Sequence, residues 1–233
     1  MPPRQTARER VRAEITREIT DIARSQLAEH GAAALSLRAV ARDLGMVSSA
    51  VYRYFSSRDE LLTALIIDGY DALGLAVERA DAARPREDHA GRWRAATRAA
   101  RDWAVAHPHE YALLYGSPVP GYQAPEDTIV PAARSAAVFG RLVSDAYAAG
   151  ALQPDPGRRS APGSLADDLG RLRAAIMPGV PDDVALTALT SWAGVFGVIS
   201  FELFGQFNNV ITDLPAYFDR AAADLARLIG LPT

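Results

Sequence analysis

Apolar residues recur at helical spacing along almost the whole chain, and no other feature constrains the fold as strongly. In residues 10–29 they follow the three- and four-residue steps of one helix face; they are Val11, Ile15, Ile19, Ile22, Ala23 and Leu27. Similar patterns predict helices over residues 37–44, 48–55, 58–79, 88–106, 109–115, 132–149, 182–206 and 215–229, and a weaker pattern covers residues 164–176. No segment alternates with the period of two that strands show. The sequence therefore predicts an all-α fold of about nine helices.

Capping residues and glycines mark several helix ends. Gly31 is expected to stop the first helix, and Ser36 is a good N-cap for the short helix that follows it. Gly45 breaks that short helix. Ser57, with Glu60 three residues later, predicts a capping box at the start of the long fourth helix.

Amino-acid usage is that of a soluble globular protein. The chain has 233 residues, of which 49% are hydrophobic and 23% charged, enough to form a core of its own. It has no cysteine, which excludes disulfides, zinc sites built on thiolates and cysteine nucleophiles. The N-terminal part shows no apolar stretch of the kind that signal peptides have, so we expect a cytoplasmic protein.

Charge is distributed unevenly. Residues 1–58 contain ten Arg against six Asp and Glu, a net charge of +4. Residues 59–233 contain fifteen Arg against twenty-two Asp and Glu, a net charge of −7. A basic N-terminal part favours an anionic partner there. The alternative is chance, because an excess of four charges is small.

Residues 184–201 carry no charge over eighteen positions, a length close to that of a membrane span. Against a span, no Arg flanks the segment to set a topology. A helix that is apolar all round is buried either in a membrane or in protein. We expect burial in protein, against a partner subunit, and no membrane association.

Residues 36–55 have the pattern of a helix-turn-helix motif. Two short helical segments meet at Gly45, where the turn needs a positive φ, and apolar residues lock them together: Val40, Leu44, Met46 and Val51. In such motifs the second helix enters the major groove of DNA. An ordinary helical hairpin is the alternative for this segment taken alone.

Residues 10–65 resemble the DNA-binding domain of TetR-like bacterial regulators. The resemblance is carried by Ala28-Glu29-His30-Gly31, Leu35-Ser36-Leu37-Arg38-Ala39-Val40-Ala41, Leu44-Gly45, Tyr52-Arg53-Tyr54-Phe55 and Ser57-Arg58-Asp59-Glu60-Leu61-Leu62. Two positions depart from the family: Val47 replaces the usual Ser or Thr, which leaves the start of the recognition helix open, and Arg58 replaces the usual Lys. Arg58 keeps the positive charge and is expected to bind phosphate.

The motif and the resemblance together give a set of candidate DNA-contacting residues. Small side chains allow close approach, and Arg and Tyr can reach bases or phosphates. The set is Ser36, Arg38, Ser48, Ser49, Ala50, Tyr52, Arg53, Tyr54 and Arg58. We expect a DNA-binding domain over residues 1–57 and an effector-binding and dimerisation domain over 58–233.

The remainder of the chain resembles a subgroup of TetR-like C-terminal domains. The resemblance is carried by His107-Pro108-His109-Glu110-Tyr111, Leu113-Leu114-Tyr115-Gly116, Pro118-Val119-Pro120-Gly121-Tyr122 and the Trp192 to Gly205 segment. It implies that this part binds a small effector and forms a homodimer through the helices at 182–206 and 215–229. The expected dimer surface is Trp192, Val195, Phe196, Ile199 and Leu203.

Aromatic residues are the candidates for an effector pocket, although each could equally be a core residue. They are Trp93, Trp103, Tyr111, Tyr115, Phe139, Tyr147, Trp192 and Phe196. We expect the pocket between the fourth helix and the helices at 88–106, 109–115, 132–149 and 182–206, with a small, mostly apolar effector. The irregular segment 150–163 is assigned no role.

Catalysis has little support in the sequence. It has no Gly-x-Ser-x-Gly elbow, no phosphate-binding glycine loop and no His-Glu-x-x-His motif. His107 and His109 flank a proline and lack an evident third ligand, so we expect no metal, no catalytic residue and no cofactor. The leading hypothesis is a repressor that binds a double-stranded operator and responds to a ligand. The alternatives are a constitutive regulator or activator of the same fold, and a small α-helical enzyme.

Overall fold

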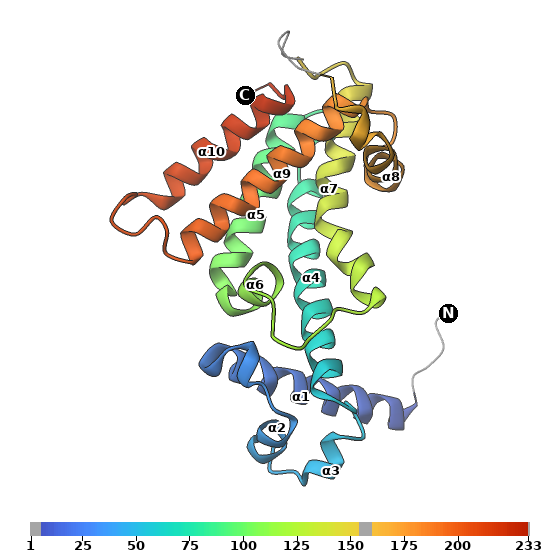
Figure 1. Ribbon diagram of the computed structural model, residues 1–233, viewed down its shortest axis with the longest axis vertical. Coiled ribbons are helices and arrows are strands. Elements are labelled where there is room, and N and C mark those ends of the chain that lie inside the picture. Colours follow the sequence, from blue (N-terminus) through green and yellow to red (C-terminus); the bar gives the residue numbers. More distant parts are fainter. Residues whose placement is uncertain (1–5, 154–159, 233) are drawn as a thin grey trace. The chain divides into compact units, whose positions relative to one another are not determined.

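The described part of the chain is helical throughout. The computed structural model describes residues 6–153 and 160–232, and in these ranges it has ten α-helices and no strand (Figure 1). The helices are α1 (Ala7–His30), α2 (Leu37–Asp43), α3 (Ser48–Val51), α4 (Arg58–Ala82), α5 (His89–Ala106), α6 (Pro108–Tyr115), α7 (Ile129–Ala148), α8 (Ala166–Ile176), α9 (Asp182–Leu203) and α10 (Leu214–Ile229). The all-α prediction is confirmed.

The helices form two compact units. Unit 1 comprises Met1–Gly69 and His107–Ile129, and unit 2 comprises Tyr70–Ala106 and Val130–Thr233. The division falls within α4, so this helix contributes to both units. Unit 1 therefore continues beyond residue 57, where the sequence placed the end of the first domain, and it also includes α6.

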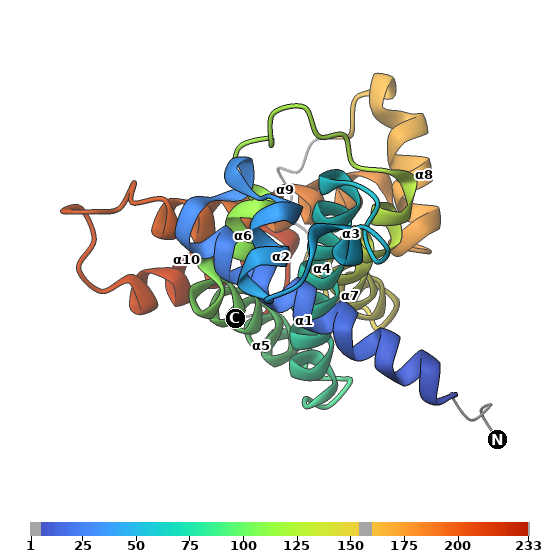
Figure 2. The same ribbon diagram turned by 90° about the horizontal axis from the view of Figure 1, so that it is seen from below.

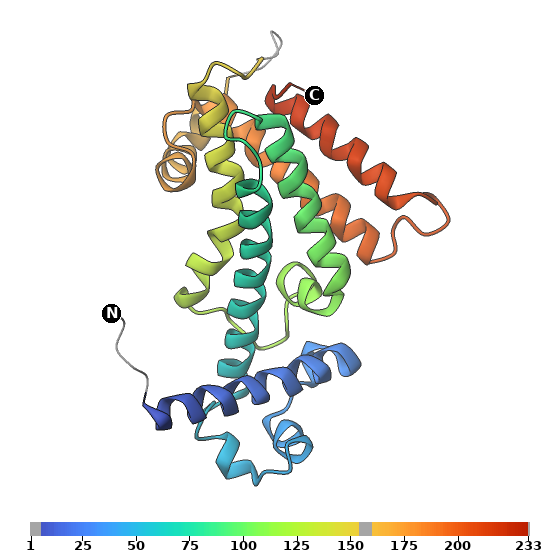
Figure 3. The ribbon, with the colours of Figure 1, turned by 180° about the vertical axis from the view of Figure 1, so that it is seen from behind.

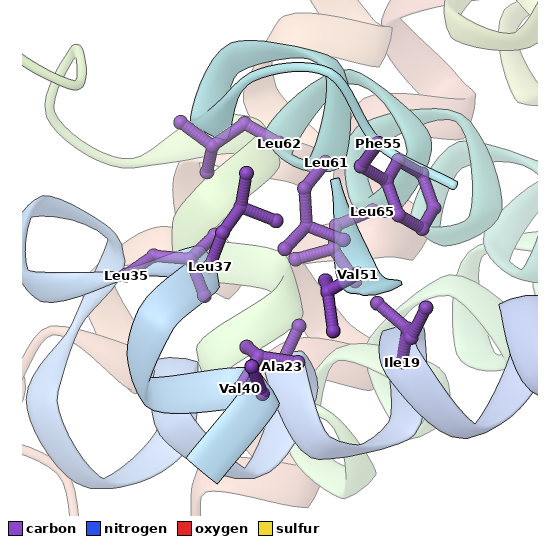
Figure 4. Packing of buried hydrophobic residues seen from close by; sticks show 11 residues of the cluster. Ile19, Ala23, Leu35, Leu37, Val40, Val51, Phe55, Leu61, Leu62 and Leu65 are labelled. Atoms are coloured by element: carbon purple, nitrogen blue, oxygen red, sulfur yellow. The ribbon is translucent and has the colours of Figure 1, made fainter. Parts of the chain in front are cut away.

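Unit 1 is built around one apolar core. α1, α2, α3 and the first turns of α4 supply side chains that are at most 5% exposed. Figure 4 shows Val51 of α3 among Ile19 of α1 and Leu61 and Leu65 of α4. Full burial of such side chains stabilises a fold by roughly 1.5–3 kcal/mol each. The core thus holds the short helix α3 in place, although four residues would not form a stable helix alone.

Hydrogen bonds and ion pairs attach α6 and the segment after it to unit 1. The Arg24 guanidinium on α1 contacts Asp68 at 2.6 Å and Glu110 of α6 at 3.1 Å. The hydroxyls of Thr63 and Tyr122 lie 2.9 Å apart. These contacts join residues distant in sequence, which is why the pattern of helices did not predict them.

Helix ends follow local chemistry. α1 begins at Ala7 because Thr6 and Glu9 form a capping box, and it ends at Gly31, as predicted. α7 begins at Ile129, three residues before the predicted start, because Pro131 is tolerated in a first turn. The Glu60 N–H donates to Ser57 Oγ at 3.1 Å, but the Glu60 carboxylate accepts from Ser56, so only half of the predicted capping box forms.

Unit 2 packs the rest of α4 with α5, α7, α8, α9 and α10. α9 and α10 run antiparallel, joined by residues 204–213, and α9 also contacts α5 and α8 (Figure 3). The indole Nε1 of Trp93 donates to the carbonyl of Ala222 at 2.8 Å, which ties α5 to α10. Arg92, fully buried, bonds Asp81 at 2.7 Å and Asp145 at 2.9 Å, so its charge is paired inside the unit.

α9 is the uncharged helix of the sequence. By length and composition it could cross a membrane, with a mean hydropathy of 1.7. In unit 2 it buries Val195, Phe196 and Ile199, which are 1%, 5% and 0% exposed. The prediction that these three residues form a dimer surface is therefore wrong, because they already pack within their own subunit. The exposed apolar residues of α9 include Leu189 and Phe201, on another face.

Candidate nucleic-acid interface and ligand cavity

The turn between α2 and α3 fixes the two helices against each other. Gly45 has φ +67°, which glycine adopts without strain. The Met46 N–H donates to the carbonyl of Ala41 at 2.9 Å. Val40 and Val51 are fully buried, and α2 and α3 lie beside each other (Figure 2). This geometry is that of a helix-turn-helix.

Among the exposed side chains of this motif are Arg38 on α2, Ser49 on α3, and Tyr52 and Arg53 directly after α3. Tyr52 is 44% exposed despite its apolar ring. Among the described residues, none hydrogen-bonds to these four side chains. We call them the recognition surface. The half-buried Ser36, Ser48 and Ala50 belong to the same two helices or directly precede α2, and α2 contacts α3.

Neither short helix has a side-chain N-cap. The Ser36 hydroxyl makes no capping hydrogen bond to α2, so the expected cap is absent. Val47 occupies the N-cap position of α3, which makes Ser48 the first residue of that helix. The structure therefore places the start of the recognition helix, which the sequence left open, at Ser48. Burial of Val51 compensates for the missing cap of this helix.

Tyr54 serves the fold more than the surface. Its half-buried ring carries the Arg12 guanidinium 5.1 Å from the ring centroid. Arg12 also reaches the carbonyl of Arg53 at 3.5 Å. Sequence reasoning missed Arg12; the one signal for it was the excess of Arg in residues 1–58. Arg12 thus links α1 to the segment after α3.

Arg58 has a role that the sequence did not predict. Its Nε donates to the carbonyl of Leu35 at 3.2 Å, and its Nη2 donates to Ala32 at 2.9 Å and Ala33 at 3.4 Å. These carbonyls belong to the 3-10 turn Ala32–Ala34 and the residue after it. The guanidinium thus holds the segment between α1 and α2, a role that the sequence did not predict beside the phosphate contact.

Charge at the end of α2 is fixed by α1. The Gln26 side-chain amide donates to Asp43 at 2.8 Å, and this bond, aided by Arg42, lowers the pKa of the Asp43 carboxyl below its usual value. A carboxylate that stays ionised to lower pH keeps the contact between α1 and α2 intact over a wider range.

Unit 2 contains an apolar cavity of about 280 Å³ between α7, α8 and α9. Its lining residues are Ala133, Ala136, Phe139, Gly140, Leu172, Ala175, Ile176, Met177, Ala188, Leu189 and Trp192. The sequence placed a cavity between α4 and the helices α5, α6, α7 and α9; this one shares α7 and α9 with that prediction but has α8 in place of α4, α5 and α6. Four alanines and a glycine create this space, which a search for aromatic residues could not reveal.

The predicted ligand-binding aromatics do not assemble in one place. Only Phe139 and Trp192 of that set line this cavity. Trp93, Trp103 and Phe196 are buried in unit 2, and Tyr147 is 41% exposed on α7. Tyr111 and Tyr115 stack on each other in unit 1, with ring centroids 4.9 Å apart. The set is therefore spread over both units, and five of its eight members are buried.

The chain is similar to known transcriptional regulators over nearly its whole length. Residues 19–65 match the family model of bacterial regulatory proteins of the tetR family, and residues 93–225 match that of the tetracyclin repressor-like C-terminal domain. HTH-type transcriptional regulators of Mycobacterium tuberculosis and Mycobacterium bovis are each 46% identical over 228 residues, which cover 93% of this chain and 91% of the relative.

Solved structures give the same result. The crystal structure of a protein assigned as regulatory has a TM-score of 0.76 at 38% identity, over 94% of this chain and 98% of that chain. A tetR-family protein from Rhodococcus RHA1 shares the fold, with a TM-score of 0.61 at 19% identity over 94% and 98% of the two chains.

Proposed function

The chain belongs to the tetR family of bacterial regulatory proteins, and from this membership we propose that it is a repressor that leaves its operator when a small, mostly apolar effector binds. It is a transcriptional regulator that binds DNA through its helix-turn-helix, and its relatives are regulators, not enzymes. In the proposal, a homodimer in the cytoplasm occupies a palindromic site.

The recognition surface is the observation that carries the proposal. Arg38, Ser49, Tyr52 and Arg53 are exposed on a rigid motif, and no described residue hydrogen-bonds to their side chains. Arginine can bond guanine in the major groove through two atoms, and serine and tyrosine hydroxyls can bond bases or phosphates. Side chains left free by the fold in this way support sequence-specific readout.

The exposed face of α9 supports a two-fold dimer. Leu189, Ala193, Gly197 and Phe201 follow each other at four-residue steps along it, and Leu189 and Phe201 are 40% and 52% exposed. A Cβ on Gly197 would meet no atom within 4 Å. Glycine inside a helix costs roughly 0.5–1 kcal/mol relative to alanine, a cost that a close crossing with the same helix of a second subunit offsets. A two-fold dimer presents two copies of α3 to an inverted repeat.

Effector release rests on the cavity in unit 2 and on α4, which belongs to both units. A ligand can lower DNA affinity only if it binds one conformation of the dimer better than another. DNA must then weaken ligand binding by the same factor. The cavity favours this reading over a constitutive regulator or activator, for which a closed unit 2 would be expected.

DNA affinity, measured on a selected site and on random duplex, tests the proposal. Tyr52→Ala and Arg53→Ala should each weaken binding to a selected site by about 1–3 kcal/mol while binding to random duplex changes less. Tyr147→Ala and Arg79→Ala, exposed positions of unit 2, are the controls. If all four variants bound the selected site equally well, Tyr52 and Arg53 would not take part in DNA recognition.

A further inference from the structure

We infer that a hollow in unit 2, between α5 and α10, binds a small phosphate monoester whose organic body carries hydroxyl groups. The hollow shares no lining residue with the apolar cavity between α7, α8 and α9. The inference goes beyond the proposed function, because it requires neither operator binding nor release from DNA.

The hollow has a fixed floor. Its volume is about 430 Å³, within the range of roughly 300–1,000 Å³ that is typical of small-molecule sites. The floor consists of small buried residues: Gly91 and Thr97 of α5, and Ala222 of α10. The Ala222 carbonyl accepts from the indole of Trp93 at 2.8 Å, and Thr97 Oγ1 donates to the carbonyl of Trp93 at 2.9 Å. Because these bonds hold α5 against α10, the hollow is formed before any ligand binds.

Gly91 leaves space at the start of α5. Its N–H donates to the Asp88 carboxylate at 2.8 Å, and a Cβ at this position would come within 1.8 Å of that carboxylate. A larger residue would therefore displace the cap of α5. The Asp88 carboxylate binds the helix backbone, and it forms no ion pair with an arginine in the described part of the chain.

The hollow is basic in a protein whose net charge is negative. Arg84, Arg94 and Arg98 line it with one carboxylate, that of Asp219, so its lining has a net charge of +2. Arg98 of α5 pairs with Asp219 of α10. Arg84 and Arg94 are exposed, and their side chains make no hydrogen bond or ion pair with a described residue. Arg92 of the same unit, in contrast, bonds two carboxylates. The fold thus leaves two guanidinium groups available at one hollow.

Two available guanidinium groups select a phosphate dianion. A guanidinium stays charged at all ordinary pH values, and its planar fork bonds phosphate oxygens through two parallel N–H donors. A concave surface lined mainly by one sign of charge also concentrates counter-ions. A phosphate monoester carries about −1.5 to −2 charges at neutral pH and has three acceptor oxygens. Its charge therefore matches the net charge of the lining.

The remainder of the lining selects a hydroxylated body for this ester. None of the eight lining residues is aromatic or a large aliphatic residue, so an apolar body would gain little from burial. A carboxylate has about four acceptor positions, and the bond to Arg98 leaves Asp219 with others. Hydroxyl groups of the ligand can donate to these oxygens. The site therefore favours a polyol phosphate over a free anion.

Calorimetric titration of the full chain tests the site with ribose 5-phosphate, and with ribose and inorganic phosphate as its two halves. The wild type should bind the ester at least about tenfold more tightly than either half, because only the ester uses both the arginines and Asp219. Arg84→Gln and Arg94→Gln should each weaken binding of the ester by at least about tenfold, the effect of one charged hydrogen bond. Arg79→Gln, which removes an exposed arginine of unit 2 outside the hollow, should bind as the wild type does.

Asp219→Ala separates the two parts of the ligand. The change frees Arg98 and removes the acceptor for hydroxyl groups. Inorganic phosphate should therefore bind this variant more tightly than it binds the wild type, and the advantage of the ester over phosphate should shrink. Without ligand, Arg84→Gln and Arg94→Gln should melt at the wild-type temperature, because neither side chain has a partner among the described residues.

Three results would overturn the inference. The first is no binding of ribose 5-phosphate by the wild type at millimolar concentration, or equal binding by the wild type and Arg94→Gln. The second is equal affinity of the wild type for the ester and for inorganic phosphate, which would leave a site for free anions only. The third is a lower melting temperature of ligand-free Arg94→Gln, which would show that this arginine serves the fold. None of these results bears on DNA binding, so the proposed function is tested separately.

Discussion

Replacing Arg58 by methionine separates two roles for this side chain: a clamp within unit 1 and a contact with DNA phosphate. Its hydrogen bonds of 2.9 and 3.2 Å to Ala32 and Leu35 are the strongest of the three it makes to carbonyls. A hydrogen bond from a charged group contributes roughly 1.5–3 kcal/mol. The side chain is 29% exposed, so water replaces part of the loss, and we expect unit 1 to lose about 2 kcal/mol of unfolding free energy.

Urea unfolding followed by circular dichroism measures this loss. With a slope of roughly 2 kcal/mol per molar, the midpoint should fall by about 1 M. Arg79→Met, an exposed arginine of the same helix, should leave it unchanged. DNA affinity of Arg58→Met should fall only as far as unfolding requires, with an unaltered salt slope. A normal urea midpoint together with weaker binding to every duplex and a slope flatter by about one would show that Arg58 binds phosphate and refute the clamp.

Three further outcomes follow from the packing. Gly197→Leu should sediment as a monomer at micromolar concentration, because the leucine side chain holds the two α9 helices apart. Gly170→Leu, at an exposed position of α8, should remain a dimer. If both variants sedimented as dimers, the two α9 helices would not cross at Gly197. Trp93→Phe should lower the free energy of unfolding by about 3 kcal/mol, through a lost buried hydrogen bond and a void; calorimetric melting equal to wild type would contradict it. Because the Gln26 bond lowers the pKa of Asp43, its stabilisation is present above the unfolded pKa and lost as pH falls through the folded one. Gln26→Met should therefore differ most from the wild type near neutral pH, and the difference should shrink in acid; a constant difference in urea midpoints would contradict this.

The sequence predicted the elements whose signals are local. Apolar spacing and Gly31 located α1, and Gly45 located the turn between α2 and α3, because a helix face and a positive φ depend on neighbouring residues. The recognition surface followed from the motif in the same way, and the exposed Tyr52 and Arg53 lie where the motif placed them.

Features that depend on distant contacts were not predictable. Arg58 looks like any surface arginine until the turn after α1 folds against it. Phe196 is a large apolar residue, which suits an interface as well as a core, and only the packing of α9 shows that it belongs to the core. The sequence placed a cavity on α7 and α9 but not on α8, because the space is what alanines and Gly140 leave empty and a sequence does not show which helix closes it.

Selection of bound sequences from a random pool of duplex DNA tests the central claim most directly. A two-fold dimer that reads bases through Tyr52 and Arg53 should enrich one inverted repeat, whose half-sites are about one helical turn or a multiple of it apart. The same selection with Arg53→Ala should lose preference at one or more symmetric positions. Enrichment of asymmetric sites, or of no sequence at all, would contradict the account of this protein as a dimeric, sequence-specific regulator.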